Sequence, residues 1–317
     1  MATKAKQQQQ ANKIIELRAL ADKPAEQTAY ALTLLETERN YLTVEAALQV
    51  LAENPVSEMR PLLLSLYKYY EEDITKRDQG ATMRAFILKV LRDMVRKDDV
   101  PLLERAASSI EFMPPGHFDE IAMGLRSAAL ITLNEIDSAL AAYHAVRLLN
   151  DEHTSKMSGE PAVTAARVLA MQRNYLPLYQ YITQPGEKIS EVLAECIRSS
   201  VDLPLSLLEK LVAEYRRSNS DAVLIGLFDL ILVHRANASF GDFVTNFLTT
   251  TRNYDVYRYL VLAILTSGQK ALITKLVEVA GQENDPRRLP LLVEVLSVTG
   301  QHDPQIKALL KKLAAIH

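Results

Sequence analysis

Few residues in this 317-residue chain have the types and the spacing that chemistry requires. The six histidines are scattered, and none of them forms a metal-ligand pattern such as His-Glu-x-x-His. The ten glycines form neither a Gly-x-Gly-x-x-Gly loop nor a P-loop. The single cysteine, Cys196, lies in the apolar segment 192–197 and is expected to be a small buried side chain. The sequence therefore predicts a protein that is not an enzyme and holds neither metal nor cofactor.

Asp229 is a carboxylate inside an otherwise apolar segment, residues 222–233. A buried charge is costly unless it is paired. Two roles are open, a general acid or base and a structural ion pair between neighbouring helices. No second carboxylate or histidine accompanies Asp229 in the sequence, which favours the ion pair, with Arg235 or Arg258 as the expected partner.

A row of basic residues is a candidate binding surface. At about 100° per residue, the row falls in one sector of the helix expected over residues 82–97, opposite its apolar stripe. Such a row could hold phosphates or an acidic partner, with Arg217 or Arg288 extending it, although a charged row is also normal for any solvated helix face. The row consists of Arg84, Lys89, Arg92 and Arg96.

Tyrosine is abundant, at 13 residues, whereas tryptophan is absent. The tyrosines gather in the segments 67–70, 175–181 and 254–259. A cluster that covers several faces of a helix cannot be wholly buried, so some rings are expected at the surface, where they make good interface anchors. Tyr257 and Arg258 are the candidates for binding a partner. For any single ring, packing between helices with the hydroxyl at the solvent edge is the alternative.

The elements that position these residues have the period of helices. Apolar residues between 83 and 95 recur at intervals of three and four, which predicts one amphipathic helix; they are Met83, Phe86, Ile87, Val90, Leu91, Met94 and Val95. Aspartate before proline marks several helix starts, at residues 22–24, 99–101, 285–286 and 303–304. Gly268, Gly281 and Gly300 each follow an apolar run and are expected to end helices.

These signals divide the chain into helix pairs at intervals of about 30–40 residues, the range of two-helix repeats. The pairs are expected to begin near Thr43, Thr82, Phe118, Pro161, Ile189, Asp221, Asp255 and Asp285. Residues 175–183 have room for only a brief helix, and 150–160 and 113–116 are the best candidate breaks. We expect a disordered tail over residues 1–10, followed by a single continuous α-solenoid of about eight helix pairs over 11–317, irregular around 150–186.

The C-terminal segment supports a family resemblance. Residues 303–310, Asp-Pro-Gln-Ile-Lys-Ala-Leu-Leu, resemble the HEAT-type pattern of Asp-Pro, a β-branched residue, and then basic and apolar residues. Residues 285–288 begin in the same way, but Arg288 stands at the β-branched position. The resemblance implies an all-α fold of HEAT-like or armadillo type, a superhelix of stacked antiparallel helix pairs, whose concave face often binds protein.

Composition restricts the setting and the partners. Hydrophobic residues make up 48% of the chain and charged residues 24%, as in an ordinary globular protein. The formal net charge of -3 disfavours nucleic acid as a partner, although it leaves room for a local basic patch. One cysteine permits no internal disulfide, the N-terminus lacks the apolar stretch of a signal peptide, and no apolar run reaches the roughly 18 residues of a membrane span. We expect a cytoplasmic protein that does not enter a membrane.

Three functions are open at this point. The favoured one is a non-enzymatic scaffold that binds a protein or peptide on one face of the superhelix. The second is nucleic-acid binding or DNA processing, because some DNA glycosylases are similar HEAT-like solenoids; the absence of tryptophan and the negative charge disfavour it. The third is an accessory subunit of a modifying enzyme, similar to solenoids of the phycobilin lyase type. The sequence determines neither the partner nor the oligomeric state.

Overall fold

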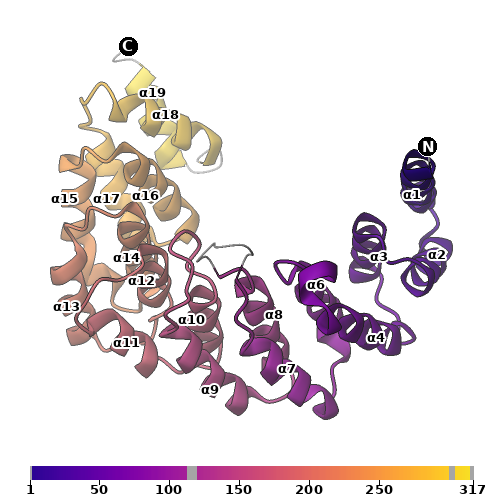
Figure 1. Ribbon diagram of the computed structural model, residues 1–317. Coiled ribbons are helices and arrows are strands. Elements are labelled where there is room, and N and C mark those ends of the chain that lie inside the picture. The colour runs from indigo at the N-terminus through magenta and orange to yellow at the C-terminus, as the bar shows by residue number, and fades with distance from the viewer. Residues whose placement is uncertain (1, 113–119, 300–303, 315–317) are drawn as a thin grey trace. The chain divides into compact units, whose positions relative to one another are not determined.

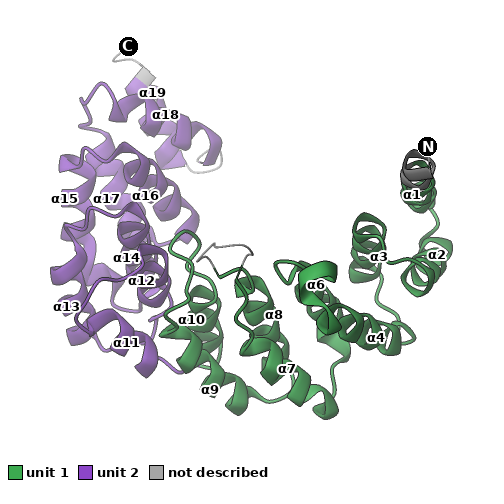
Figure 2. Cartoon of the chain, in the orientation of Figure 1, with its two compact units in different colours: residues 1–172 green, residues 173–317 purple. Residues whose placement is uncertain are grey.

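The chain is all-α. A computed structural model describes residues 2–112, 120–299 and 304–314 (Figure 1). These residues form nineteen α-helices and three short 3-10 helices, and within the described ranges the only β-type pairing is an isolated bridge between Phe112 and Glu120. The chain divides into two compact units, Met1–Gln172 and Arg173–His317 (Figure 2).

The first unit contains ten α-helices within its described residues. Their bounds are α1 (Ala2–Ala19), α2 (Pro24–Thr37), α3 (Tyr41–Glu53), α4 (Met59–Glu72), α5 (Ile74–Arg77), α6 (Thr82–Leu91), α7 (Val100–Ala107), α8 (Met123–Asn134), α9 (Ser138–Leu149) and α10 (Ala162–Met171). The helices α3, α6, α8 and α10 pack on one another in that order, and α2, α4, α7 and α9 pack against members of this layer or against each other. The buried core lies between the helices of successive pairs.

The second unit repeats this arrangement. Its helices are α11 (Leu176–Thr183), α12 (Ser190–Arg198), α13 (Leu205–Tyr215), α14 (Asp221–Val233), α15 (Gly241–Thr250), α16 (Tyr254–Ser267), α17 (Lys270–Ala280), α18 (Arg288–Thr299) and α19 (Pro304–Ala314). The helices α12, α14, α16 and α18 pack in sequence as one layer, and α15, α17 and α19 pack as a second. Figure 1 shows α12, α14 and α16 along one side of this unit and α13 and α15 along the other.

Most of the predicted pair starts are confirmed to within three residues. The helices α3, α6, α10, α12, α14, α16 and α18 begin where a pair was expected. The eight-residue α11 confirms the brief helix predicted for residues 175–183. Phe118 and the break at 113–116 lie outside the described residues, and α8, the next helix, begins at Met123.

The helix predicted over residues 82–97 is shorter than expected. The α-helix α6 ends at Leu91, and the 3-10 turns η1 (Arg92–Met94) and η2 (Lys97–Asp99) follow it. Asp99 accounts for the break, because its carboxylate accepts a hydrogen bond from the backbone N–H of Arg96 and pairs with Arg60 at 2.7 Å. These contacts turn the chain into α7 instead of continuing α6.

The predicted helix ends are also largely confirmed. Pro24 and Pro304 are the first residues of α2 and α19, and Asp285 accepts hydrogen bonds from the N–H groups of Arg287 and Arg288 at the start of α18. Gly268 ends α16 in the left-handed conformation that favours glycine. Gly281 follows α17 with a right-handed backbone, so its expected left-handed role is wrong. Asp303 and Gly300 lie outside the described residues.

Of two segments expected to be irregular, the first is helical and the second is a loop held to a neighbouring helix. Helix α1 begins at Ala2, within the segment expected to be a disordered tail, and its alanine, lysine and glutamine residues are good helix formers. The loop 150–160 is held to α8, because Asp151 pairs with Arg126 and the carboxylate of Glu160 accepts a hydrogen bond from Ser127 at 2.8 Å. The continuity of the array from residue 11 to residue 317 stays a prediction.

A buried arginine joins consecutive pairs in the first unit. The side chain of Arg126 in α8 is 1% exposed and donates to Glu120 at 2.6 Å and to Asp151 in the loop after α9. Glu120 in turn accepts the backbone N–H of Ala122 at 2.6 Å. One guanidinium therefore satisfies the carboxylate beside the start of its own helix and a carboxylate in the loop that leads from α9 to the following pair.

The same device occurs in α6. Arg84 is 3% exposed and donates to Asp78 at 2.8 Å and to Glu111 at 3.0 Å. The carboxylate of Asp78 accepts the N–H groups of Met83 and Arg84, which have no partner inside the helix.

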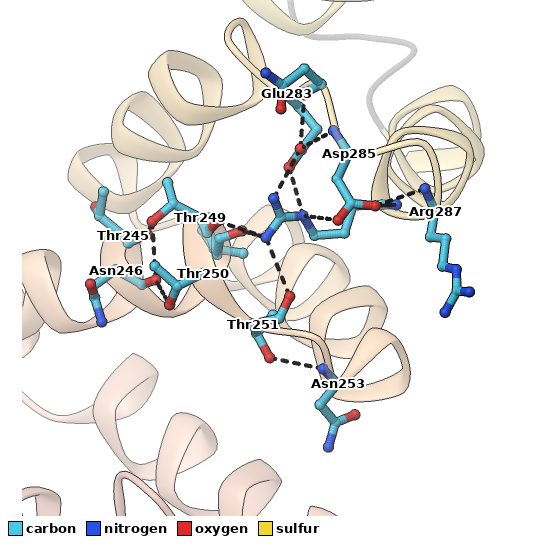
Figure 3. A network of polar contacts seen from close by, with 12 residues as sticks. Thr245, Asn246, Thr249, Thr250, Thr251, Asn253, Glu283, Asp285 and Arg287 are labelled. Atoms are coloured by element: carbon cyan, nitrogen blue, oxygen red, sulfur yellow. Dashed lines mark hydrogen bonds and ion pairs between the residues drawn. The ribbon is translucent and has the colours of Figure 1, made fainter.

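The second unit has its counterpart at Arg288. Figure 3 shows the polar network there, with Thr249, Thr251 and Glu283 labelled. The guanidinium of Arg288 donates to the carbonyl oxygens of Leu248, Thr249 and Thr251, at the C-terminal end of α15. It also donates to Glu283 at 3.2 Å. Carbonyl groups at a helix C-terminus lack partners within the helix and carry partial negative charge, so a cation is favourable there.

Other side chains close helix ends in the same way. Arg147 of α9 donates to the carbonyl of Ala107, the last residue of α7, and Lys312 of α19 donates to the carbonyl of Gly281 after α17; both distances are 2.9 Å. In each case the donor comes from a helix of a later pair. These hydrogen bonds fix the register of one pair on the next.

Replacing Arg126 with methionine should lower the free energy of unfolding by about 3–5 kcal/mol, because Glu120 and Asp151 would remain as uncompensated charges in the interior. Urea unfolding followed by circular dichroism measures this change. The matched control is Arg92→Met, which removes the pair between Arg92 and Glu135, whose side chains are 44% and 38% exposed. Solvent screens that pair, so the control should lose less than about 1 kcal/mol. Equal losses would contradict the role of Arg126.

Candidate functional site

The layer of α12, α14, α16 and α18 carries a partly exposed strip of side chains along each helix. In α14 the strip consists of Ile225, Asp229 and Val233, which are four residues apart and lie on one helix face. Between Val223 and Leu232 the other residues of α14 are buried, because α12 and α16 cover its two flanks and α13 packs against it as well. The strips of neighbouring helices border two pockets.

The first pocket lies between α14, α16 and α18. Its volume is about 430 Å³. Apolar side chains dominate its lining, and two of them, Leu262 and Val298, are 40% and 75% exposed. Its charged residues are Asp255, Arg258 and Glu294, of which Arg258 and Glu294 form an ion pair at 2.5 Å.

The second pocket lies between α12, α14 and α16 and has a volume of about 520 Å³. It is lined by Arg198, Asp229 and apolar residues that include Val233, which is 62% exposed. Tyr259 lines both pockets, so the two are adjacent on either side of α16. We call the two pockets together the α16 groove.

Asp229 is held in an ion pair inside the α16 groove. Its carboxylate accepts a hydrogen bond from Nε of Arg198 at 2.7 Å and a short one from the hydroxyl of Tyr259. The predicted ion pair between helices is thus present, but its expected partners, Arg235 and Arg258, are wrong. Burial and the hydrogen bond to Asp229 raise the pKa of Tyr259 to about 12, so the hydroxyl stays protonated near neutral pH and donates.

Gly226 brings the walls of the second pocket together. A Cβ atom at this position would lie 2.5 Å from the carbonyl oxygen of Ala194 in α12, which is closer than atoms can approach. Glycine therefore permits the tight packing of α12 on α14. That packing sets Arg198 within reach of Asp229.

The predicted basic row is not a continuous surface. Arg84 is buried in the ion-pair network of α6, so its expected place on a solvated face is wrong. Lys89, Arg92 and Arg96 are exposed, and Arg92 donates to Glu135. Arg288, a candidate extension of the row, is buried at the end of α15. Phosphate binding by the three exposed residues stays a prediction.

Of the two candidate binding residues on α16, one is buried and the other is exposed. Tyr257 is 2% exposed and lies in the core, so its expected place at a surface is wrong. Arg258, the next residue, is exposed and lines the α16 groove. Consecutive helix residues are about 100° apart, so one can face the interior while the next faces solvent. Binding of a partner by Arg258 stays a prediction.

Cys196 is fully buried in α12, which confirms the expectation of a small buried side chain. Burial raises the pKa of its thiol and disfavours the reactive thiolate.

Sequence reasoning missed Arg198, Tyr259 and the exposed Val298. A signal for the first two was present, because Asp229 is 31 residues from Arg198 and 30 residues from Tyr259. That separation is one helix pair, so residues one repeat apart on the same face are candidates for contact.

Comparison with known proteins yields no relative: no family model, curated protein or solved structure matches the chain. Among the described residues, no helix is long and apolar enough to cross a membrane. The same residues contain no group of three histidine, cysteine, aspartate or glutamate side chains placed to hold a metal ion.

The buried tyrosines predict a loss of stability at high pH. Burial raises the pKa of Tyr70 to about 12 and also raises the pKa of Tyr67, whereas an unfolded tyrosine ionises near 10.0. The part of the folding stability that depends on these raised pKa values is fully present below pH 10.0. It is lost as the pH rises through the folded pKa. Neither hydroxyl has a hydrogen-bond partner among the described residues. The variant Tyr67→Phe/Tyr70→Phe should match the wild type at neutral pH.

At about pH 11 the same variant should be more stable than the wild type by about 1 kcal/mol per tyrosine, measured by urea unfolding at each pH. A variant with an unchanged pH dependence would show that these two groups do not titrate on unfolding.

Replacing Asp229 with alanine removes the acceptor for Arg198 and Tyr259. The side chain of Arg198 is 39% exposed, so solvent screens the pair, and the expected loss is about 1 kcal/mol. The control is Glu294→Gln, in a pair whose side chains are 54% and 51% exposed, with an expected loss below about 0.5 kcal/mol. Thermal unfolding measures both. An Asp229→Ala protein as stable as the control would contradict the structural role of this ion pair.

Proposed function

We propose that the protein is a non-enzymatic scaffold that binds a protein partner in the α16 groove. The proposal includes the finer architecture, a HEAT-like solenoid of helix pairs. Successive helix packing within each unit supports it, as do side-chain contacts at the separation of one repeat. Such contacts join Arg198 to Asp229, Arg258 to Glu294 and Lys275 to Asp242, over 31, 36 and 33 residues.

The observation that carries the proposal is the exposure of large apolar side chains around the α16 groove. Val233, Leu262 and Val298 are 62%, 40% and 75% exposed, and they come from α14, α16 and α18, three neighbouring helices of one layer. A single exposed apolar residue is ordinary, but a group around a concave site is typical of a place where a partner binds. Arg258 and the partly buried Tyr259 add the residue types that are enriched in binding hot spots.

The polar groups of the groove support recognition over catalysis. Asp229 is engaged by Arg198 and Tyr259, and Arg258 is engaged by Glu294. Groups held in this way are rigid, so little side-chain freedom is lost when a partner binds. No specific observation favours the nucleic-acid or accessory-subunit alternative.

The test is an affinity purification with the full chain and the variant Val298→Asp. A charge in the apolar part of the groove should reduce recovery of the partner at least about tenfold, because a buried unpaired charge would oppose binding. Since Val298 is exposed, the free energy of unfolding should change by less than about 0.5 kcal/mol.

The matched control is Leu176→Asp on α11, at a residue that is 82% exposed and does not line the groove. It should recover the partner as the wild type does. Equal recovery by all three proteins, or equal loss in both variants, would contradict binding in the α16 groove.

A further inference from the structure

The α16 groove contains more carboxylates than basic groups. Its carboxylates are Asp229, Asp255 and Glu294, and its guanidinium groups are Arg198 and Arg258. Each guanidinium is already paired, Arg198 with Asp229 and Arg258 with Glu294. Asp255 is exposed and forms no ion pair with any described residue.

A second carboxylate, Glu195, also offsets the positive charge of Arg198. Glu195, whose side chain is 8% exposed, lies 3.2 Å from Arg198 in the same helix. This guanidinium therefore faces two carboxylates, Glu195 and Asp229. The charged residues that line the groove are three carboxylates and two guanidinium groups, an excess of one negative charge that favours cationic groups over phosphates and carboxylates.

The two pockets define the spacing of the groups that they can receive. They lie on either side of α16, and neighbouring packed helices are about 8–10 Å apart. Two apolar side chains about 10 Å apart fit this spacing. Positions about seven residues apart on one face of a helix meet it, as do positions three apart in a polyproline II segment, which has three residues per turn.

From these charges and this spacing we infer that the groove binds a basic peptide segment of another protein, which places one apolar side chain in each pocket and a lysine or arginine beside Asp255. This inference rests on the proposed function and gives the chemistry of the partner. Tyr259, fixed by its hydrogen bond to Asp229, separates the two apolar side chains.

The test is a selection from a random library of displayed peptides of about twelve residues, a length that spans both pockets in either conformation. The full-length protein is the target. Selected peptides should carry a net positive charge and two apolar residues at one of the two spacings. A synthetic peptide of the selected sequence is then titrated against the protein by fluorescence anisotropy.

Two variants test whether the acidic residues of the groove contribute to peptide binding. The charge reversal Asp255→Lys/Glu294→Lys should weaken binding of that peptide at least about tenfold, and added salt should weaken binding to the wild type. Asp242→Lys is the matched control, because Asp242 is also an exposed acid in the first turn of a helix but lies on α15, outside the groove. The control should bind as the wild type does.

The outcomes separate the two claims. Selection of no peptide, or of peptides that bind Val298→Asp as well as the wild type, would overturn the proposed function. Peptides that require Val298 but are acidic or neutral, or that are unaffected by the charge reversal, would overturn only the inferred basic chemistry. A dimer in light scattering that Val298→Asp dissociates would show a second copy of this chain in the groove and would also overturn the inference.

Discussion

The structure depends on how the helix ends are satisfied between successive pairs. A helix of ten or so residues leaves a large share of its N–H and carbonyl groups without partners inside the helix. In this chain buried arginines meet that need. Arg126 joins the acid beside the start of α8 to the loop after α9, and Arg288 joins the acid before α18 to the carbonyl end of α15. Each interaction also ties a helix to a segment that joins two pairs, and a guanidinium does so in a fixed geometry because it forms several hydrogen bonds in one plane.

Register determines what the α16 groove presents. Once α12, α14, α16 and α18 pack as a layer, residues one repeat apart on the same face become neighbours. Arg198, Asp229 and Tyr259 meet for this reason, and so do Arg258 and Glu294. The apolar side chains between these polar contacts lie on the face of the layer that its own helices do not cover. The exposed Val298 and Leu262 follow from the same layer geometry that buries most of each helix.

Much of the fold could be predicted from the sequence, because apolar period, proline and glycine act locally. Pro24, Pro304 and Gly268 mark helix ends for reasons that need no tertiary information. The side-chain environments were harder to predict. Arg84 was expected in a solvated row because its position was placed opposite the apolar stripe of its helix, but Asp78 and Glu111 surround it in the interior. Asp78 is six residues away and Glu111 is 27, and the period of one helix contains no information about either contact. The period of one helix likewise does not tell that Tyr257 is buried by neighbouring helices while Arg258 is exposed.

We propose that a protein partner binds in the α16 groove. The most direct measurement places a photo-crosslinking amino acid at residue 262, in the groove, and in a second protein at residue 176, outside it. Irradiation in the presence of the partner should give a cross-linked product from residue 262 and none from residue 176. The same product from both positions, or a product from residue 176 alone, would contradict this proposal.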